Sequence, residues 1–284
     1  MALLILLLTV GSVWLLRMNW IESNGQWGDR WYSALRQFLL PPLLLLATAI
    51  AIPLQMLDRS VIWSWDKKLS CAVCVVFLGW ALLLWLHLMQ RGKRMLQQVN
   101  LYPEMNLYTA TARIVDFSMP YSAQIGFWRP TLVVSTELFT VLEPYHIEAV
   151  LAHEQAHSHY RDTFWFFWLG WVRRTTSWLP GTETIWQELL LLRELRADQY
   201  AALQTNPFLL AEALLLVAQN TPILLEDGCI AFNQVALKSR LVERIEALLD
   251  KPISMNPSGW KLWGVLLPTL IPFLVIDCHF YAAF

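Results

Sequence analysis

The sequence predicts an α+β membrane protein, in which about four transmembrane helices flank one small domain of sheet and helices. Of the 284 residues, 56% are hydrophobic and only 15% are charged, whereas soluble domains carry about 25% charged residues. The apolar residues gather in a few long runs, as expected for segments that cross a bilayer. Between the third and fourth runs lies a region of mixed character, which is long enough for one folded domain.

Four apolar runs are the predicted membrane segments. The first has no Lys or Arg before it and ends in bulky side chains, unlike a signal peptide, so we interpret it as a retained span. Each of the others approaches the roughly 20 residues that a transmembrane helix needs. The four runs are residues 1–16, 38–57, 70–89 and 260–284.

These runs divide the chain into three predicted parts. Residues 1–94 form an N-terminal membrane region with three spans, 95–255 form the folded domain, and 256–284 form a C-terminal transmembrane segment. Lys and Arg are more frequent on the flanks that would face the cytoplasm if the folded domain lies there. By the positive-inside rule, we expect a multi-pass protein of the cell membrane with a cytoplasmic domain.

The folded domain begins with short β-branched segments bounded by Gly and Pro, which predict the strands of a small sheet. These segments are 111–117, 122–127 and 131–135. From Pro144 onward the apolar spacing becomes helical. Further helices are predicted at 183–204, 208–219 and 237–250.

Residues 163–172 form a Trp-rich apolar stretch that is too short to span a bilayer. Trp favours the water–lipid boundary, so a re-entrant or interfacial segment is one interpretation. A buried core helix is the other, and the pattern favours neither.

The chemistry-bearing motif is His153-Glu154-Gln-Ala-His157. On a helix, residues four apart share one face, so both imidazoles can bind one metal ion. Glu154 lies beside them and can take a proton from water that a zinc ion activates. The motif predicts one Zn²⁺ per chain, held by His153 and His157, with Glu154 as the catalytic base.

A catalytic zinc needs a third protein ligand. The best candidate is Glu194, because Asp198 follows it four residues later on the same helix face. Asp198 can then accept a hydrogen bond from the nitrogen of a ligand histidine that does not bind the metal. Glu188 is the alternative third ligand, whereas His146 and His159 are unsuitably placed around or along the helix.

Other classes of protein are less well supported. The formal net charge is −1 and no basic stripe is present, so we expect no nucleic-acid partner. Cys71 and Cys74 form a C-x-x-C at the start of an apolar run, without a second pair nearby, and we interpret them as small residues of a membrane helix. The predicted spans carry too few ionisable residues for a transporter.

Three stretches resemble the BlaR/MecR-type membrane metallopeptidases of bacteria. They are YSAQIGFWRPTLVVSTEL (121–138), HIEAVLAHEQAHSHYRD (146–162) and LLRELRADQYA (191–201). The resemblance covers about residues 115–205. It implies a small zincin-like (gluzincin) peptidase domain, zinc held by His153, His157 and Glu194, and cleavage of a protein substrate at the membrane. The penicillin-binding sensor domain of the receptor members is not expected here.

The predicted function is therefore that of an integral-membrane zinc endopeptidase, which cleaves a protein or peptide near the lipid bilayer in regulatory proteolysis. A transcriptional repressor as substrate is an expectation from the family alone. A strand near residues 131–136 is expected to pair with the extended substrate. Two alternatives remain open: a membrane metallopeptidase like the CAAX prenyl proteases, and a zinc-binding membrane sensor or scaffold without catalysis.

Overall fold

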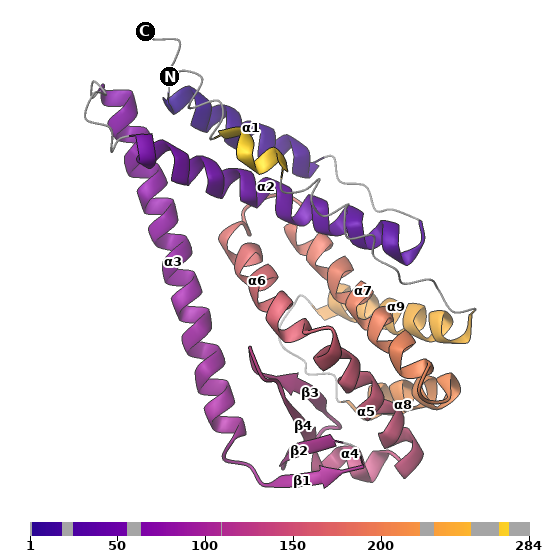
Figure 1. Cartoon of the computed structure of the whole chain (residues 1–284). Helices are drawn as coiled ribbons and strands as arrows, with labels where there is room; N and C mark the ends of the chain where they lie inside the picture. Colours follow the sequence, from indigo (N-terminus) through magenta and orange to yellow (C-terminus); the bar gives the residue numbers. More distant parts are fainter. Residues whose placement is uncertain are drawn as a thin grey trace. The chain divides into compact units, whose positions relative to one another are not determined.

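A computed structural model describes residues 2–18, 25–55, 64–108, 110–221, 230–250 and 267–272 of the chain (Figure 1). It is a mostly helical α+β structure with one small sheet. Residue contacts divide the chain into two compact units. The first comprises Met1–Leu88, Leu169–Leu189 and Met255–Phe284, and the second comprises Met89–Trp168 and Leu190–Ser254.

Apolar helices dominate the first unit. Two described helices, α2 (Trp27–Gln55) and the longer α3 (Trp65–Val99), have the length and composition to cross a membrane, whereas α1 (Ala2–Met18) is apolar but shorter. Only 17% of the most apolar stretch of α3 is buried, so its Val and Leu side chains face outward as they would toward lipid. Two candidate spans are therefore present. The predicted first span stays a prediction, and most of the fourth lies outside the described residues, where only 267–272 are seen, including the short 3-10 helix η1 (Leu267–Leu270).

The second unit holds the sheet. Its strands are β1 (Glu104–Leu107), β2 (Ala110–Val115), β3 (Ser122–Ile125) and β4 (Thr131–Ser135). Their order is β1-β2-β4-β3, with β2 and β4 parallel and the other pairs antiparallel. The three predicted strands are confirmed in position, and β1 is an additional one.

One expectation about this sheet is wrong. Strand β4 pairs with β2 on one side and with β3 on the other, so its backbone hydrogen-bonding groups are already engaged. An extended peptide can add only to a sheet edge, because only an edge presents unpaired N–H and C=O groups. The edge strand that lies beside the helices is β3. Residues 131–136 therefore cannot be the strand that pairs with an extended peptide.

One face of the sheet packs against helices to form the core of the second unit. Leu132 and Val134 of β4 and Ala112 of β2 lie on this face, because alternate strand residues point the same way. They contact apolar residues of α4 (Thr136–Val141), α5 (Pro144–His159) and α8 (Pro207–Asn220). This packing holds α5, the helix that carries the HExxH motif, against the sheet.

The remaining helices are α6 (Asp162–Thr175), α7 (Thr182–Ala202) and α9 (Ile230–Leu249). The predicted helices at 183–204, 208–219 and 237–250 correspond to α7, α8 and α9, within a few residues except at the start of α9. The Trp-rich stretch 163–172 lies in α6. There Leu169 and Val172 are buried, whereas Trp165 is 58% exposed. Whether this helix is re-entrant, interfacial or a core helix stays a prediction.

Candidate metal and catalytic site

Helix α5 positions both histidines and the acid of the motif. It begins at Pro144, whose fixed φ suits the first helical turn. His153 and His157 are one turn apart, and their Nε2 atoms lie 3.1 Å from each other. His153 and Glu154 are buried, at 8% and 5% exposure. Two imidazole nitrogens this close together in a buried place could share one cation.

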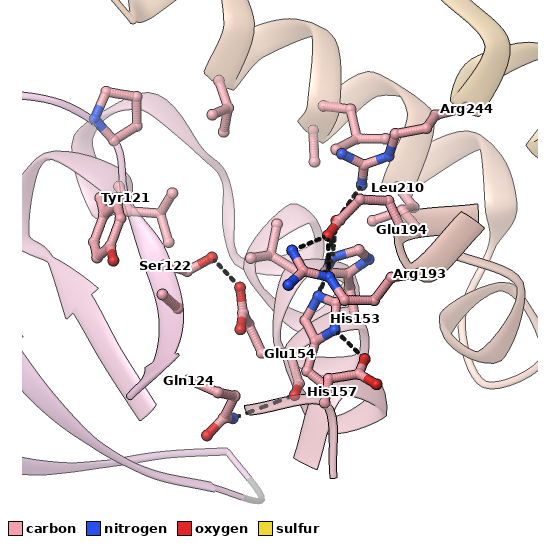
Figure 2. Close-up of a pocket in the computed structure, with 18 of the residues that line it drawn as sticks. Tyr121, Ser122, Gln124, His153, Glu154, His157, Arg193, Glu194, Leu210 and Arg244 are labelled. Carbon is pink, nitrogen blue, oxygen red and sulfur yellow. Dashed lines mark hydrogen bonds and ion pairs between the residues drawn. The ribbon is translucent and has the colours of Figure 1, made fainter. Parts of the chain in front are cut away.

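Helix α7 brings the third ligand group to the same point. Oε2 of Glu194 lies 3.3 Å from Nε2 of His153 and 3.8 Å from Nε2 of His157 (Figure 2). One ligand atom from each of the three residues lies within 4.8 Å of the other two. His153, His157 and Glu194 form a group that could hold a metal ion.

A carboxylate also holds the second ring nitrogen, Nδ1, of each histidine. Nδ1 of His153 lies 2.8 Å from Oδ1 of Asp198, and Nδ1 of His157 lies 2.8 Å from Oδ2 of Asp162. A carboxylate at Nδ1 keeps the proton on that nitrogen, which leaves Nε2 free to bind a metal. In both histidines a carboxylate at Nδ1 thus leaves Nε2 as the nitrogen that could bind a metal ion.

Arginines hold these carboxylates in turn. Arg244 of α9 donates two hydrogen bonds to Asp198, of 2.7 and 2.8 Å, and Arg196 binds Asp162. Arg193 donates to the Glu194 oxygen that faces away from the histidines, at 2.6 and 3.0 Å. Arg244 also lies 3.6 Å from Oε2 of Glu194, the oxygen that faces the histidines, so the guanidiniums orient the acids and one of them borders the candidate metal position.

The electrostatics of the site favour a cation between the ligands. Burial lowers the pKa of His153, but Asp198 and Glu194 outweigh burial and raise that pKa to about 10. Burial likewise raises the pKa of Glu194, yet His153, Arg193 and Arg244 hold it well below its usual range. An ionised Glu194 thus faces the His153 imidazole, whose pKa is raised, and a metal ion can replace the proton there.

Glu154 follows His153 on α5 and is held by hydrogen bonds from a different part of the fold. Its Oε1 accepts a hydrogen bond of 2.7 Å from the Ser122 hydroxyl, and its backbone carbonyl accepts one from Gln124 (Figure 2). Both partners come from strand β3. The sheet therefore sets the orientation of Glu154 relative to α5.

A pocket of about 440 Å³ opens over these residues. Its polar lining comes from the motif, Glu194, Arg193 and Arg244, and residues 120–124 around β3 also line it. Its apolar lining includes Leu138, Val150, Leu210, Ala213, Leu214 and Val217. The pocket can therefore take a ligand that has both a polar backbone and apolar side chains.

The predicted site residues come together in the second unit, with Glu154 and Asp198 next to the group that could hold a metal ion. Glu188 does not join them, because its carboxylate makes a two-fold hydrogen bond with Arg30 of α2, at 2.8 and 3.0 Å. His146 is buried 3.2 Å from Glu212, and His159 stacks on Tyr200. Neither histidine belongs to the group.

Sequence reasoning missed several contributors, among them Asp162, Arg244 and Ser122. Arg244 could have been found, because it lies at helical spacing between Leu241 and Leu248 on the apolar stripe of its helix. A charge on a buried face needs a partner. Ser122 gave a weaker signal, as a polar residue that alternates with Ala123 in a strand. Asp162 gave none, because its position depends on how α5 ends.

No protein-family model matches this chain, and no curated protein matches it significantly.

Proposed function

We propose that this chain is an integral-membrane zinc endopeptidase that cleaves a protein or peptide substrate close to the bilayer. The observation that carries the proposal is the convergence of two imidazoles and one carboxylate, from α5 and α7, beside a separate glutamate that does not belong to the ligand group. A purely structural zinc site closes all four positions with protein ligands. Among the described residues only three ligand groups converge here.

The distances support zinc as the metal. Two ligands at about 2.0–2.1 Å from a tetrahedral zinc lie about 3.3 Å apart. The separations here are 3.1, 3.3 and 3.8 Å, so two of the three already match and the third needs a small adjustment. A two-His, one-Glu donor set with one position left for water is a known arrangement of catalytic zinc.

The residues of the chain then take distinct roles. Bound zinc would polarise the scissile carbonyl and make the attacking water more acidic. Glu154 accepts the proton of that water and passes it to the leaving amine, as a general base and then a general acid. His153, His157 and Glu194 hold the metal, while Asp198 and Asp162 fix the two imidazoles.

The sheet offers a way to hold an extended substrate. Strand β3 is an edge strand whose residues line the pocket beside Glu154. A peptide that adds to this edge would place its backbone next to the base and its side chains in or out of the pocket alternately. Because the edge of the sheet at β3 is open, a long peptide can bind along it, which agrees with cleavage within a chain rather than at its end.

The biological setting is proposed from the resemblance to the BlaR/MecR-type peptidases. It implies regulatory proteolysis, with a transcriptional repressor as one class of substrate. The two candidate spans α2 and α3 support a membrane location.

The test uses the full-length chain purified in detergent micelles. We expect about one zinc per chain by elemental mass spectrometry and cleavage of fluorescein-labelled casein. The Glu154→Gln variant should keep the zinc and lose the cleavage, because Glu154 is a base and not a ligand. Loss of zinc in this variant would place Glu154 in the coordination shell. Stable zinc binding without any cleavage by the unmodified chain would favour the sensor or scaffold alternative.

A further inference from the structure

The two carboxylate oxygens of Glu154 have different surroundings. Oε1 accepts the hydrogen bond from Ser122. Oε2 is buried and has no hydrogen-bond partner among the described residues. Leaving a buried charged oxygen without a donor is costly. Its place in the pocket wall indicates that a ligand with a proton to give, such as the attacking water, completes its hydrogen bonding.

The position of Ser122 explains why the two oxygens of Glu154 have different surroundings. Val134 of β4 is its register partner and belongs to the core face of the sheet, so the Ser122 side chain points to the same face, toward α5. Strand β3 extends this face beyond the apolar core to Glu154. A hydroxyl in place of an apolar side chain there serves the carboxylate and not the packing.

The backbone N–H and C=O groups of Ser122 point away from β4. The Tyr121 carbonyl oxygen accepts a hydrogen bond of 2.9 Å from the backbone N–H of Ser135 in β4, and the Tyr121 N–H donates one to the Ser135 side-chain hydroxyl. Because hydrogen-bonded pairs alternate along an antiparallel ladder, the N–H and C=O groups of Ser122 point to the free edge of β3. An added substrate strand would pair with these groups.

We propose that Ser122 is a positioning residue that links substrate register to the orientation of the base. Its hydroxyl holds Oε1 of Glu154, so that Oε2 alone is presented to the reacting water. Its backbone pairs with the peptide, so that the scissile bond arrives at a fixed distance from that oxygen. This inference rests on the proposed peptidase function.

The first test compares three variants of the full chain in the casein assay. Ser122→Ala removes the hydroxyl, and the loss of a hydrogen bond to a charged group should lower kcat about 10-fold. Its KM and zinc content should stay within about twofold of the unmodified chain. Ser122→Thr keeps the hydroxyl and suits a strand, so it should restore most of kcat. Ser118→Ala, an exposed serine outside the pocket, is the matched control.

The second test needs no peptide cleavage. Acetohydroxamate binds a zinc ion through its oxygens and offers its proton to a neighbouring carboxylate. We expect Ser122→Ala to weaken acetohydroxamate binding to the zinc-loaded chain about 10-fold, while Ser118→Ala leaves it unchanged. Equal affinity of Ser122→Ala and the unmodified chain, or equal kcat, would overturn the role of Ser122. If the unmodified chain binds acetohydroxamate but cleaves nothing, the peptidase proposal fails, and the hydroxamate result alone decides on Ser122.

Discussion

The two histidines of the candidate metal site are held by acids that differ in how they reach the site. Asp198 follows Glu194 by one helical turn on α7, whereas Asp162 lies just beyond α5, at the start of α6. Sequence spacing predicts the first arrangement, since positions four apart share a helix face. The second depends on a tight corner between two helices. Both acids nonetheless contact the Nδ1 atom of a histidine and fix the orientation of its ring.

Asp162→Asn tests the acid that the sequence did not reveal. Asparagine keeps the shape but loses the charge that fixes His157, so we expect zinc affinity to fall about 10- to 100-fold. Asp198→Asn should have a comparable effect through His153. Competition with a chelator measures both. Asp116→Asn serves as the control, because Asp116 is exposed and accepts a hydrogen bond from the Thr136 hydroxyl. An Asp162 variant that behaves like this control would remove Asp162 from the site.

Glu194 and Glu188 lie on the same helix and allow a paired comparison. Glu194→Ala removes a ligand and should abolish both zinc binding and cleavage. Glu188→Ala should retain zinc and instead lower the thermal unfolding midpoint, because the two hydrogen bonds to the Arg30 guanidinium are lost. Zinc retention by Glu194→Ala would show that the third ligand is misassigned.

At the scale of single elements, periodicity predicts most helices and strands β2, β3 and β4, because their apolar residues recur with the spacing of a buried face. Strand pairing is not encoded in this way. Nothing in the residues 131–135 distinguishes an interior strand from an edge strand, and β1 has a mostly exposed, polar pattern that resembles a loop. Arg161 precedes α6 and adopts a φ of 55°. An arginine does not predict this conformation, because residues with a side chain rarely have a positive φ.

Gly126 ends β3 with a φ of 134°, which residues with a side chain rarely adopt. A Cβ there would also lie 2.8 Å from the Arg129 carbonyl oxygen. We expect Gly126→Ala to destabilise the turn between β3 and β4 by about 1–3 kcal/mol and to lower kcat, since β3 orients Glu154. Unfolding in denaturant and the casein assay measure the two effects.

The matched control for this change is Gly92→Ala in α3. A Cβ at Gly92 meets nothing within 4 Å, and alanine favours a helix over glycine. This variant should be as stable as the unmodified chain or slightly more so. Equal stability of the Gly126 and Gly92 variants would contradict the strain assigned to the turn.

At the scale of the whole molecule, the topology stays a prediction from the distribution of Lys and Arg. Single cysteines at Gln98 and Ser64, in a background without the four native cysteines, can test it with a membrane-impermeant maleimide on intact cells. A cytoplasmic peptidase domain predicts labelling of position 64 only, until the cells are opened. Labelling of position 98 in intact cells would invert the topology and direct the search for substrates to exported proteins.

The position of Arg244 in α9 has a consequence for the order in which the site is assembled. His153, His157 and Asp162 are neighbours in the sequence and can approach one another as soon as the corner between α5 and α6 forms. Arg244, which holds Asp198, is synthesised last among these residues. Contacts between distant parts of a chain form late, because closing the intervening loop costs entropy. Tight zinc loading would then mark a fully folded domain, and zinc retention by ribosome-bound chains stalled before and after α9 would measure that order.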